Sequence, residues 1–212
     1  MYKNRTDAGR RLAQLLAERG VEGDVVLAVP RGGLPVGRVV ADRLGLPLDI
    51  VAARKIGSPR NPELAIGAVA SDGTRWLNDE LIDDLDVDSQ YLKDAIERER
   101  EAALSKVQRY RGDRPPMELD GKRVLIVDDG VATGATTIAC IRQVVAAGAE
   151  RVVLAVPVGP RHTVERLRSE ADEVFCVETP RYFSAVGQFY ESFEQVSDER
   201  AKAYLGETEG GE

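Results

Sequence analysis

The chain alternates short apolar runs with amphipathic segments, and this alternation limits the folds that it can adopt. Apolar runs at residues 25–29, 123–127 and 151–156 are each followed by a segment whose apolar residues recur at helical spacing. Strands without polar alternation are typical of a parallel sheet that is buried on both faces. The predicted fold class is therefore α/β, a parallel sheet flanked by helices, in a 212-residue chain that can bury one core and a small additional lobe.

The predicted elements follow from hydrophobic spacing and from turn residues. Helices are expected at 7–20, 34–44, 88–110, 134–147 and 161–170, and strands at 25–29, 49–53, 65–70, 74–77, 123–127, 151–156 and 173–177. Asp72-Gly73 predicts a hairpin turn between the two strands that flank it. Residues 54–63, RKIGSPRNPE, break all periodicity with a glycine and two prolines and are predicted to form an exposed loop.

Composition excludes several classes of function. The formal net charge is −7, and the basic residues are scattered among acids, which argues against a general nucleic-acid binder. The longest apolar runs are too short to span a bilayer, and the N-terminus lacks the apolar segment of a signal peptide, so the cytoplasm is the expected location. Cys140 and Cys176 stand in apolar settings and are expected to be reduced thiols; a single histidine, His162, rules out a His-rich zinc site.

The stretch Val124–Thr137, VLIVDDGVATGATT, places two carboxylates at the end of a buried strand. In an open α/β sheet, ligands bind beyond the carboxyl ends of the strands. The backbone N–H groups of Gly130–Thr137 could hold a phosphate at the start of a helix, and Asp128 and Asp129 would then accept hydrogen bonds from sugar hydroxyls. Together these groups describe a site for a ribose 5-phosphate. Two alternatives are acids that merely form a turn and a response-regulator receiver, but a receiver carries a phosphoacceptor Asp on a later strand, and residues 152–159 contain no Asp.

This stretch resembles the phosphoribosyl-pyrophosphate motif of the type I phosphoribosyltransferases, and within that family the chain looks most like the members whose acceptor is unassigned. The resemblance implies a parallel sheet with a small hood lobe and transfer of a phosphoribosyl group from phosphoribosyl pyrophosphate to a nitrogen base, within nucleotide salvage. It also implies Mg²⁺ that arrives with the substrate, near Asp128 and Asp129, with no direct protein ligand. The residues implied to bind the 5-phosphate are Gly130, Val131, Ala132, Thr133, Gly134, Ala135, Thr136 and Thr137.

Two further segments fit the same resemblance. AVPRGGLPVG, residues 28–37, is similar to the family's pyrophosphate loop, in which Arg31, Gly32 and Gly33 would hold the leaving group. Arg54 and Lys55, with the loop that follows to Glu63, resemble the flexible lid that closes over the site. Taken alone, the first segment could be only a tight strand-to-helix turn.

The acceptor base is less defined. Aromatic residues concentrate near the C-terminus, and Tyr182, Phe183 and Phe189 could stack on a planar ring, or could simply pack against the protein. Ala132 stands where the hypoxanthine-guanine branch of the family has an acidic residue, so a purine acceptor of another type is favoured.

The predicted organisation is one domain over residues 1–206 with a disordered tail at 207–212. The core is expected at about 21–160, and the hood is expected from the N-terminal helix and about 171–200. Family members are commonly dimers, so a homodimer is expected. The alternative function is a non-catalytic nucleotide-sensing regulator that keeps this fold.

Overall fold

The computed structural model describes residues 1–206; the tail predicted to be disordered lies outside the described residues. Five parallel strands form the main sheet, in the order β2-β1-β6-β7-β8. Their bounds are β1 (Val25–Ala28), β2 (Leu48–Ile50), β6 (Arg123–Val127), β7 (Arg151–Val158) and β8 (Glu173–Glu178). The predicted parallel α/β fold class is confirmed.

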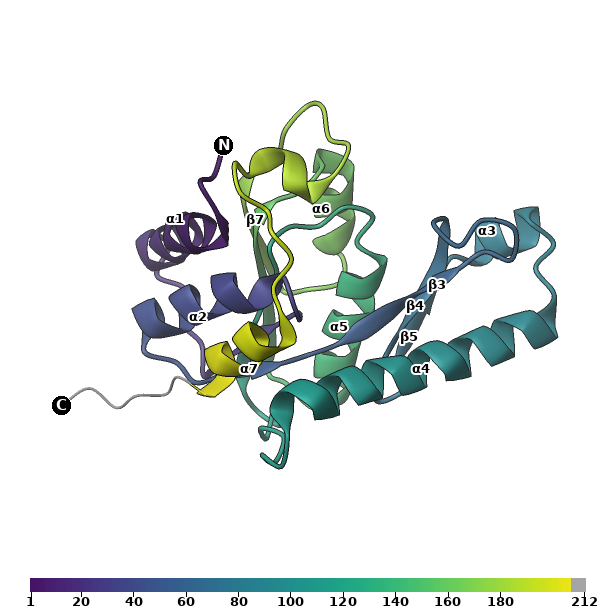
Figure 1. The fold of residues 1–212 in the computed structure, drawn as a ribbon, viewed down its shortest axis with the longest axis horizontal. Helices are drawn as coiled ribbons and strands as arrows, with labels where there is room; N and C mark the ends of the chain where they lie inside the picture. Colours follow the sequence, from purple (N-terminus) through teal and green to yellow (C-terminus); the bar gives the residue numbers. More distant parts are fainter. Residues whose placement is uncertain (207–212) are drawn as a thin grey trace.

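Helices cover both faces of the main sheet (Figure 1). One face carries α1 (Arg5–Glu18), α2 (Gly33–Leu44) and α7 (Asp198–Gly206), and the other carries α5 (Ala135–Ala146) and α6 (Arg161–Leu167). Successive residues of each strand point to opposite faces. In β6, Leu125 packs with the α1–α2 side, whereas Val124 and Ile126 pack with the α5–α6 side. The uninterrupted apolar strands therefore supply two cores at once.

A second, antiparallel sheet extends from the main body as an arm, seen at the right of Figure 1. It contains β3 (Ala53–Gly57), β4 (Ala65–Ala70) and β5 (Arg75–Leu77), and it is followed by α3 (Asp79–Asp84) and the long helix α4 (Ser89–Arg111). Ile56, Ile66 and Val69 are buried together with Ala95 of α4, so the arm has its own small core. Ala68 and Ala70 of β4 also join the core beneath α5, which attaches the arm to the main body.

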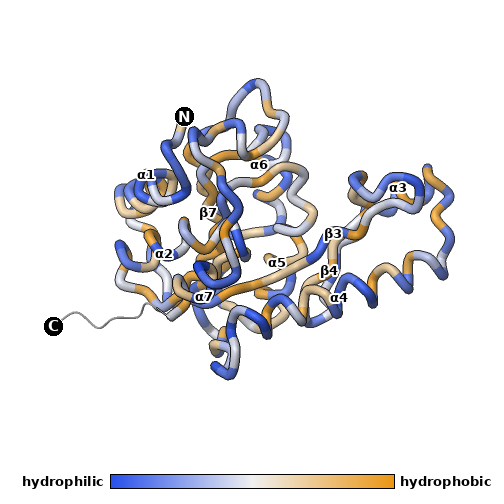
Figure 2. Tube along the Cα trace, in the orientation of Figure 1, coloured by the Kyte–Doolittle hydropathy of each residue, from blue (hydrophilic) through white to orange (hydrophobic). Residues whose placement is uncertain are grey.

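The distribution of hydropathy follows these layers. Figure 2 shows apolar colours gathered in the central strands and along β4, whereas α4 alternates between polar and apolar positions. Ala95, Ala103, Val107 and Tyr110 are the buried positions of α4, and they recur at helical spacing. Within residues 1–206, no helix is both long enough and apolar enough to cross a membrane.

Most predicted elements are confirmed, including the hairpin of β4 and β5 around Asp72-Gly73. One strand prediction is wrong. The run at 49–53 is not a single strand, because the chain leaves the main sheet after Ile50 and begins β3 at Ala53. The two short helices α3 and α7 were not predicted.

The prediction of one irregular loop over residues 54–63 is wrong for its first part. Arg54 to Gly57 belong to β3, because β4 lies antiparallel to them and pairs with their backbone groups. A sequence window contains no information about that partner strand. The loop proper spans 58–64 and is closed by hydrogen bonds from the Ser58 N–H to the Leu64 carbonyl oxygen at 2.9 Å and from the Ser58 hydroxyl to the Asn61 carbonyl oxygen at 2.9 Å.

The limits predicted for core and hood stay predictions. The structure places residues 173–178, which fall inside the range predicted for the hood, in the main sheet as strand β8.

Leu154 in the centre of β7 provides a test of the two-core arrangement. Its side chain is fully buried, so Leu154→Ala should lower the free energy of unfolding by about 3 kcal/mol through lost burial and a residual cavity. Val145→Ala, at a position that is 53% exposed on α5, should change it by less than about 1 kcal/mol. Urea unfolding of both variants measures the difference, and equal losses would contradict the burial described here.

Candidate active site

The two glycine-containing turns predicted to bind ligand follow neighbouring strands. From β1 the chain moves to β2 on one side, and later returns to place β6 on the other side of β1. The strand order therefore reverses between β1 and β6, and such a switch point is where open α/β sheets bind ligands. The turn of Arg31 to Gly33 follows β1, and Asp128-Asp129 follow β6.

These two turns are in direct contact. The N–H of Val29 donates to the carbonyl oxygen of Val127 at 2.9 Å, which continues the β1–β6 pairing past the strand ends. A Cβ atom at Gly32 would lie 2.1 Å from Oδ2 of Asp129, and one at Gly33 would lie 2.8 Å from the carbonyl oxygen of Val127. Gly33 thus requires glycine, because its added Cβ would meet backbone atoms, whereas a side chain at Gly32 would have to displace the Asp129 carboxylate.

The acidic pair is largely withdrawn from solvent. Burial raises the pKa of Asp128 well above its ordinary value, and the negative charge of Asp129 raises that pKa further. Burial also raises the pKa of Asp129, although its ion pair with Arg5 opposes this effect. The Asp129 N–H donates to Oδ1 of Asp128 at 2.8 Å and so supports the ionised form of Asp128. Two adjacent carboxylates with raised pKa values are typical of a functional site.

A cap made from two segments far apart in the sequence, residues 1–5 and 183–194, covers the acidic pair. Nε of Arg5 lies 2.7 Å from Oδ2 of Asp129, and the Tyr190 hydroxyl donates to the Asp129 carbonyl oxygen at 2.6 Å. Tyr2 is fully buried, donates its hydroxyl to the Pro157 carbonyl oxygen at 2.8 Å and packs on the ring of Tyr190. Burial raises the pKa of both tyrosines, so they act here as neutral donors.

The loop after the acidic pair leads into α5. Gly134 precedes the helix with φ of +79°, and a Cβ atom there would lie 2.9 Å from the Thr163 side chain. Within residues 1–206, no side chain caps the N-terminus of α5, so its first N–H groups are open to an anion. Of the predicted hydroxyl donors, Thr133 is exposed, Thr136 is half-buried and Thr137 is buried.

The other members of the predicted phosphate loop frame this opening. Gly130 packs against Val158 and Val186, and the N–H of Val131 donates to the Val158 carbonyl oxygen at 2.9 Å. Ala132 is exposed, and its carbonyl oxygen accepts a hydrogen bond from the Thr163 hydroxyl at 2.7 Å; Ala135 is buried. The loop is therefore held on its outer side by β7 and α6.

The predicted cations are only partly brought together. Arg31 and Arg54 line one hollow beside the first turn. Lys55 follows Arg54 in β3, and neighbouring residues of a strand point to opposite faces. Its ammonium lies 3.0 Å from a carboxylate oxygen of Glu63, outside that hollow. Arg54 in turn pairs with Glu99 of α4 at 3.1 Å.

The three aromatic residues predicted to contact a base differ in their surroundings. Tyr182 is 88% exposed. Phe183 and Phe189 stack on each other, with ring centroids 5.4 Å apart, and pack in the same cluster as Tyr2. Phe183 also lines a hollow of about 490 Å³ with residues at the start of α6.

Sequence reasoning missed Arg5, Lys106 and Asp198, which pairs with Arg31 at 3.1 Å. Arg5 was not singled out, because nothing in its local sequence reveals a partner 124 positions away. Lys106 of α4 donates to the Pro30 carbonyl oxygen at 2.5 Å, directly beside the first turn. For Lys106 the sequence did contain one signal of its position. Lys106 follows the buried Ala103 by three residues and precedes the buried Val107 and Tyr110 on the same helix.

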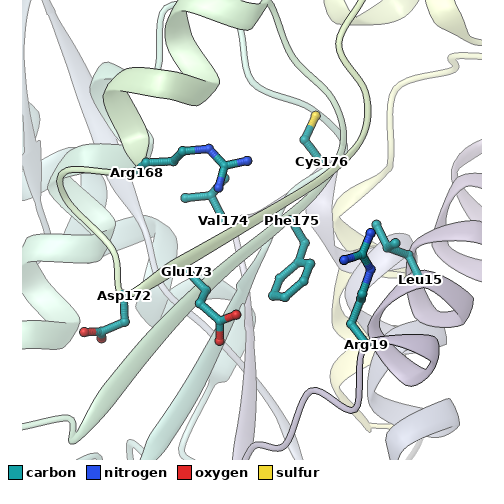
Figure 3. Close-up of a pocket in the computed structure, with 8 residues that line it drawn as sticks. All are labelled: Leu15, Arg19, Arg168, Asp172, Glu173, Val174, Phe175 and Cys176. Carbon is teal, nitrogen blue, oxygen red and sulfur yellow. The ribbon is translucent and has the colours of Figure 1, made fainter.

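Other hollows lie away from these residues. The one drawn in Figure 3 has a volume of about 490 Å³ and lies beside the first half of β8. Arg19 and Arg168 line it together with Asp172 and Glu173, so its charges are balanced. It contains none of the predicted site residues. Within residues 1–206, no group of three or more His, Cys, Asp or Glu side chains is arranged to hold a metal ion.

Comparison with known proteins identifies relatives that cover nearly the whole chain. Residues 2–193 match the family model described as "Phosphoribosyl transferase domain". A protein of Mycobacterium tuberculosis, provisionally named a phosphoribosyl transferase, is 46% identical over 206 residues, which make up 97% of this chain and 46% of that protein. The chain thus spans about half the length of the curated relatives that it matches.

Solved structures show the same fold. The crystal structure of TT1426 from Thermus thermophilus has 43% sequence identity and a TM-score of 0.83, and the match covers 99% of each chain. A hypothetical protein from Neisseria gonorrhoeae, solved with bound ppGpp, has 16% identity and a TM-score of 0.50, over 94% of this chain and 91% of that one. At that identity the second match is a likeness of fold alone.

The close approach at Gly33 is testable by adding one methyl group. Gly33→Ala should lower the free energy of unfolding by about 1 to 3 kcal/mol, because the new Cβ meets backbone atoms of Val127 and Asp128 that have no room to move. Gly206→Ala, where no atom of the described residues 1–206 lies within 4 Å of the added Cβ, is the matched control. Guanidinium unfolding gives both values, and an unaffected Gly33→Ala variant would contradict the close approach.

The buried acid Asp128 should make stability depend on pH. A carboxyl whose pKa is raised on folding destabilises the native state once the pH exceeds its unfolded pKa, which is near 4. Asp128→Asn removes this charge while its Oδ1 can still accept from Asp129, so it should stabilise the fold at pH 7 by on the order of 1 kcal/mol. The gain should shrink as the pH falls toward 4.

Melting temperatures measured from pH 4 to pH 8 check this prediction. Asp84→Asn, at an exposed position in α3, is the control and should show no such gain. A melting temperature of Asp128→Asn that stays at or below that of the unmodified chain at pH 7 would contradict it.

Proposed function

The chain belongs to the phosphoribosyl transferase domain family, and on this basis we propose that it transfers a 5-phosphoribosyl group from phosphoribosyl pyrophosphate to a nitrogen base and releases pyrophosphate. One observation carries the proposal. The acidic pair, the Gly32-Gly33 turn and the open N-terminus of α5 meet at the point where the strand order reverses. Phosphoribosyl pyrophosphate carries a diol, a diphosphate and a monophosphate on one sugar. Such a ligand needs three binding groups that lie side by side.

The phosphate end of the substrate is assigned to α5. The first N–H groups of that helix and the exposed Thr133 hydroxyl can donate to phosphate oxygens, and the helix dipole favours negative charge at this place. Gly134 keeps the approach open, since its backbone conformation and the nearby Thr163 both disfavour a side chain.

The ribose is assigned to the acidic pair. Ionised carboxylates accept hydrogen bonds from vicinal hydroxyls and fix the orientation of the ring. Departure of pyrophosphate leaves positive charge on the sugar, and the negative charges of Asp128 and Asp129 stabilise it. Because the pair is already held by Arg5 and by the Asp129 N–H, little reorganisation is needed when this charge develops.

The leaving group is assigned to the first turn and the arm. The backbone N–H group of Gly32, with the guanidinium groups of Arg31 and Arg54, can donate to the pyrophosphate oxygens, whereas the Gly33 N–H already donates to the Val29 carbonyl oxygen at 2.9 Å. Lys55 lies on the opposite side of β3, at the base of loop 58–64, and its contact with the substrate requires that this loop close over the site.

The chemistry of the donors also fits Mg²⁺. This ion binds through one or two carboxylates together with substrate phosphates. Oδ1 of Asp128 accepts from the Asp129 N–H, and within residues 1–206 no donor contacts Oδ2, so this oxygen can hold the ion directly or through water. When bound, Mg²⁺ would neutralise charge on the pyrophosphate group.

The acceptor is proposed to be a nitrogen base, with a purine favoured over other rings. Phe183 and Phe189 lie in the cap next to the acidic pair and offer aromatic surface, and Tyr182 is exposed beside them. Ala132 brings no acid to the phosphate loop, which disfavours a hypoxanthine-guanine type of acceptor. We also propose a homodimer that acts in nucleotide salvage in the cytoplasm.

Pyrophosphate release from phosphoribosyl pyrophosphate and Mg²⁺, measured against a panel of purines, pyrimidines and other nitrogen bases, tests the proposal. Release with one base is the expected result. The double variant Asp128→Asn/Asp129→Asn should lower the rate by at least about 100-fold, because it removes the charge that stabilises the transition state.

The control for this test is a second pair of adjacent acids. Asp83 and Asp84 lie exposed at the end of α3, and Asp83→Asn/Asp84→Asn should leave the rate unchanged. An unchanged rate in the Asp128/Asp129 variant would refute the site assignment. Binding of the activated sugar without release for any base would favour the nucleotide-sensing regulator instead.

A further inference from the structure

A positively charged hollow of about 410 Å³ lies beside the turn after β1, where β3, α4 and α7 meet. Four cations from three parts of the chain line it: Arg31, Arg54, Lys106 and Arg109. Within residues 1–206, Asp198, at the start of α7, is the one carboxylate that lines it. In a chain with a net charge of −7, such a concentration of cations indicates a site for an anion.

The protein's own Asp198 is held there by three donors. Nη1 of Arg31 lies 3.1 Å from Oδ1, the Tyr110 hydroxyl lies 2.7 Å from the same oxygen, and Nη1 of Arg109 lies 3.2 Å from Oδ2. The hydrogen bond from Tyr110, aided by both arginines, lowers the pKa of Asp198. Both carboxylate oxygens are thus bound, as the oxygens of a phosphate would be.

Arg31 and Arg109 contact Asp198, whereas Lys106 contacts a backbone carbonyl oxygen. Its ammonium donates to the Pro30 carbonyl oxygen, and within residues 1–206 no carboxylate lies within ion-pair distance of it. Burial lowers the pKa of Lys106, and repulsion from Arg54 adds to this effect, while attraction to Asp128 opposes it. An ammonium has three N–H donors, so Lys106, which lines the hollow, retains donors beyond the one that contacts Pro30.

We infer that Lys106 and Arg109 of α4 bind the diphosphate group of the substrate, and that Asp198 occupies this place until the diphosphate displaces it. The inference rests on the proposed function, because Arg31 and Arg54 are shared by both sites. It adds two ligands from a helix that the proposed mechanism does not use. It also makes the start of α7 an internal competitor of the substrate.

Calorimetric titration of the full chain with inorganic pyrophosphate tests this inference. Asp198→Asn should tighten binding by about fivefold or more, because the competing carboxylate is gone. Lys106→Gln, which keeps an N–H donor on the side chain but has no charge, should weaken binding by about tenfold. Arg109→Gln should weaken it as well, although the other two donors still hold Asp198.

The control variant is Glu199→Gln. It removes the same charge from the next residue of α7, where the side chain is exposed and does not line the hollow. Binding within twofold of the unmodified chain is expected. Tightening equal to that of Asp198→Asn would show a general charge effect and overturn the inference, as would unchanged pyrophosphate binding in both Asp198→Asn and Lys106→Gln.

Inorganic phosphate serves as a second probe. It should bind at least about tenfold more weakly than pyrophosphate, and equal affinities would overturn the assignment to a diphosphate. Failure of the inference can be told apart from failure of the proposed function, because pyrophosphate binding requires no transfer. Transfer that depends on Asp128 and Asp129, with pyrophosphate binding insensitive to Asp198, would refute only the inference. Sensitivity to Asp198 without any transfer would refute only the transferase.

Discussion

The close contact between the ends of β1 and β6 is the constraint on which the rest of the site depends. The sheet brings two loops from distant parts of the chain within backbone distance, and the Val29 N–H continues their pairing to the Val127 carbonyl oxygen. Side chains at Gly32 or Gly33 would collide with the acidic turn. Since the acidic pair, the first turn and the start of α5 all branch from this contact, their relative positions are set by the sheet and not by flexible loops.

Charge is distributed unevenly around this contact. On one side Asp128 and Asp129 lie largely buried, and burial of adjacent carboxylates opposes folding. On the other side lies a cationic hollow, which is lined by Arg31, Arg54 and residues of α4. Arg5 partly neutralises the acids through its ion pair with Asp129. Asp198 partly neutralises the cations through its ion pair with Arg31. The net charge of −7 conceals this separation.

How much could be predicted from the sequence depended on whether the signal was local. The uninterrupted apolar runs of β6 and β7 and the Asp-Gly turn between β4 and β5 are local patterns, and they identified the sheet and the hairpin. The motif around Asp128 was also contiguous. In contrast, Arg54 to Gly57 became a strand only through pairing with β4, and Arg5, Lys106 and Asp198 reach the site only through tertiary packing. Among these residues, only Lys106 has a local signal, its position three residues after Ala103 and before Val107 and Tyr110 on the same helix.

The cap described above joins two segments that lie far apart in the sequence. Tyr2 pairs with Tyr190, and Arg5 contacts both Asp129 and the carbonyl oxygen of Glu194, which is 189 positions away in sequence. During synthesis the sheet around β1 and β6 can pair long before residue 190 leaves the ribosome, but the acidic pair remains uncovered until then. Contacts of such sequence separation form late and slowly. The acidic pair is therefore covered only after residues 183–194 have been made, when the strands of the core can already be paired.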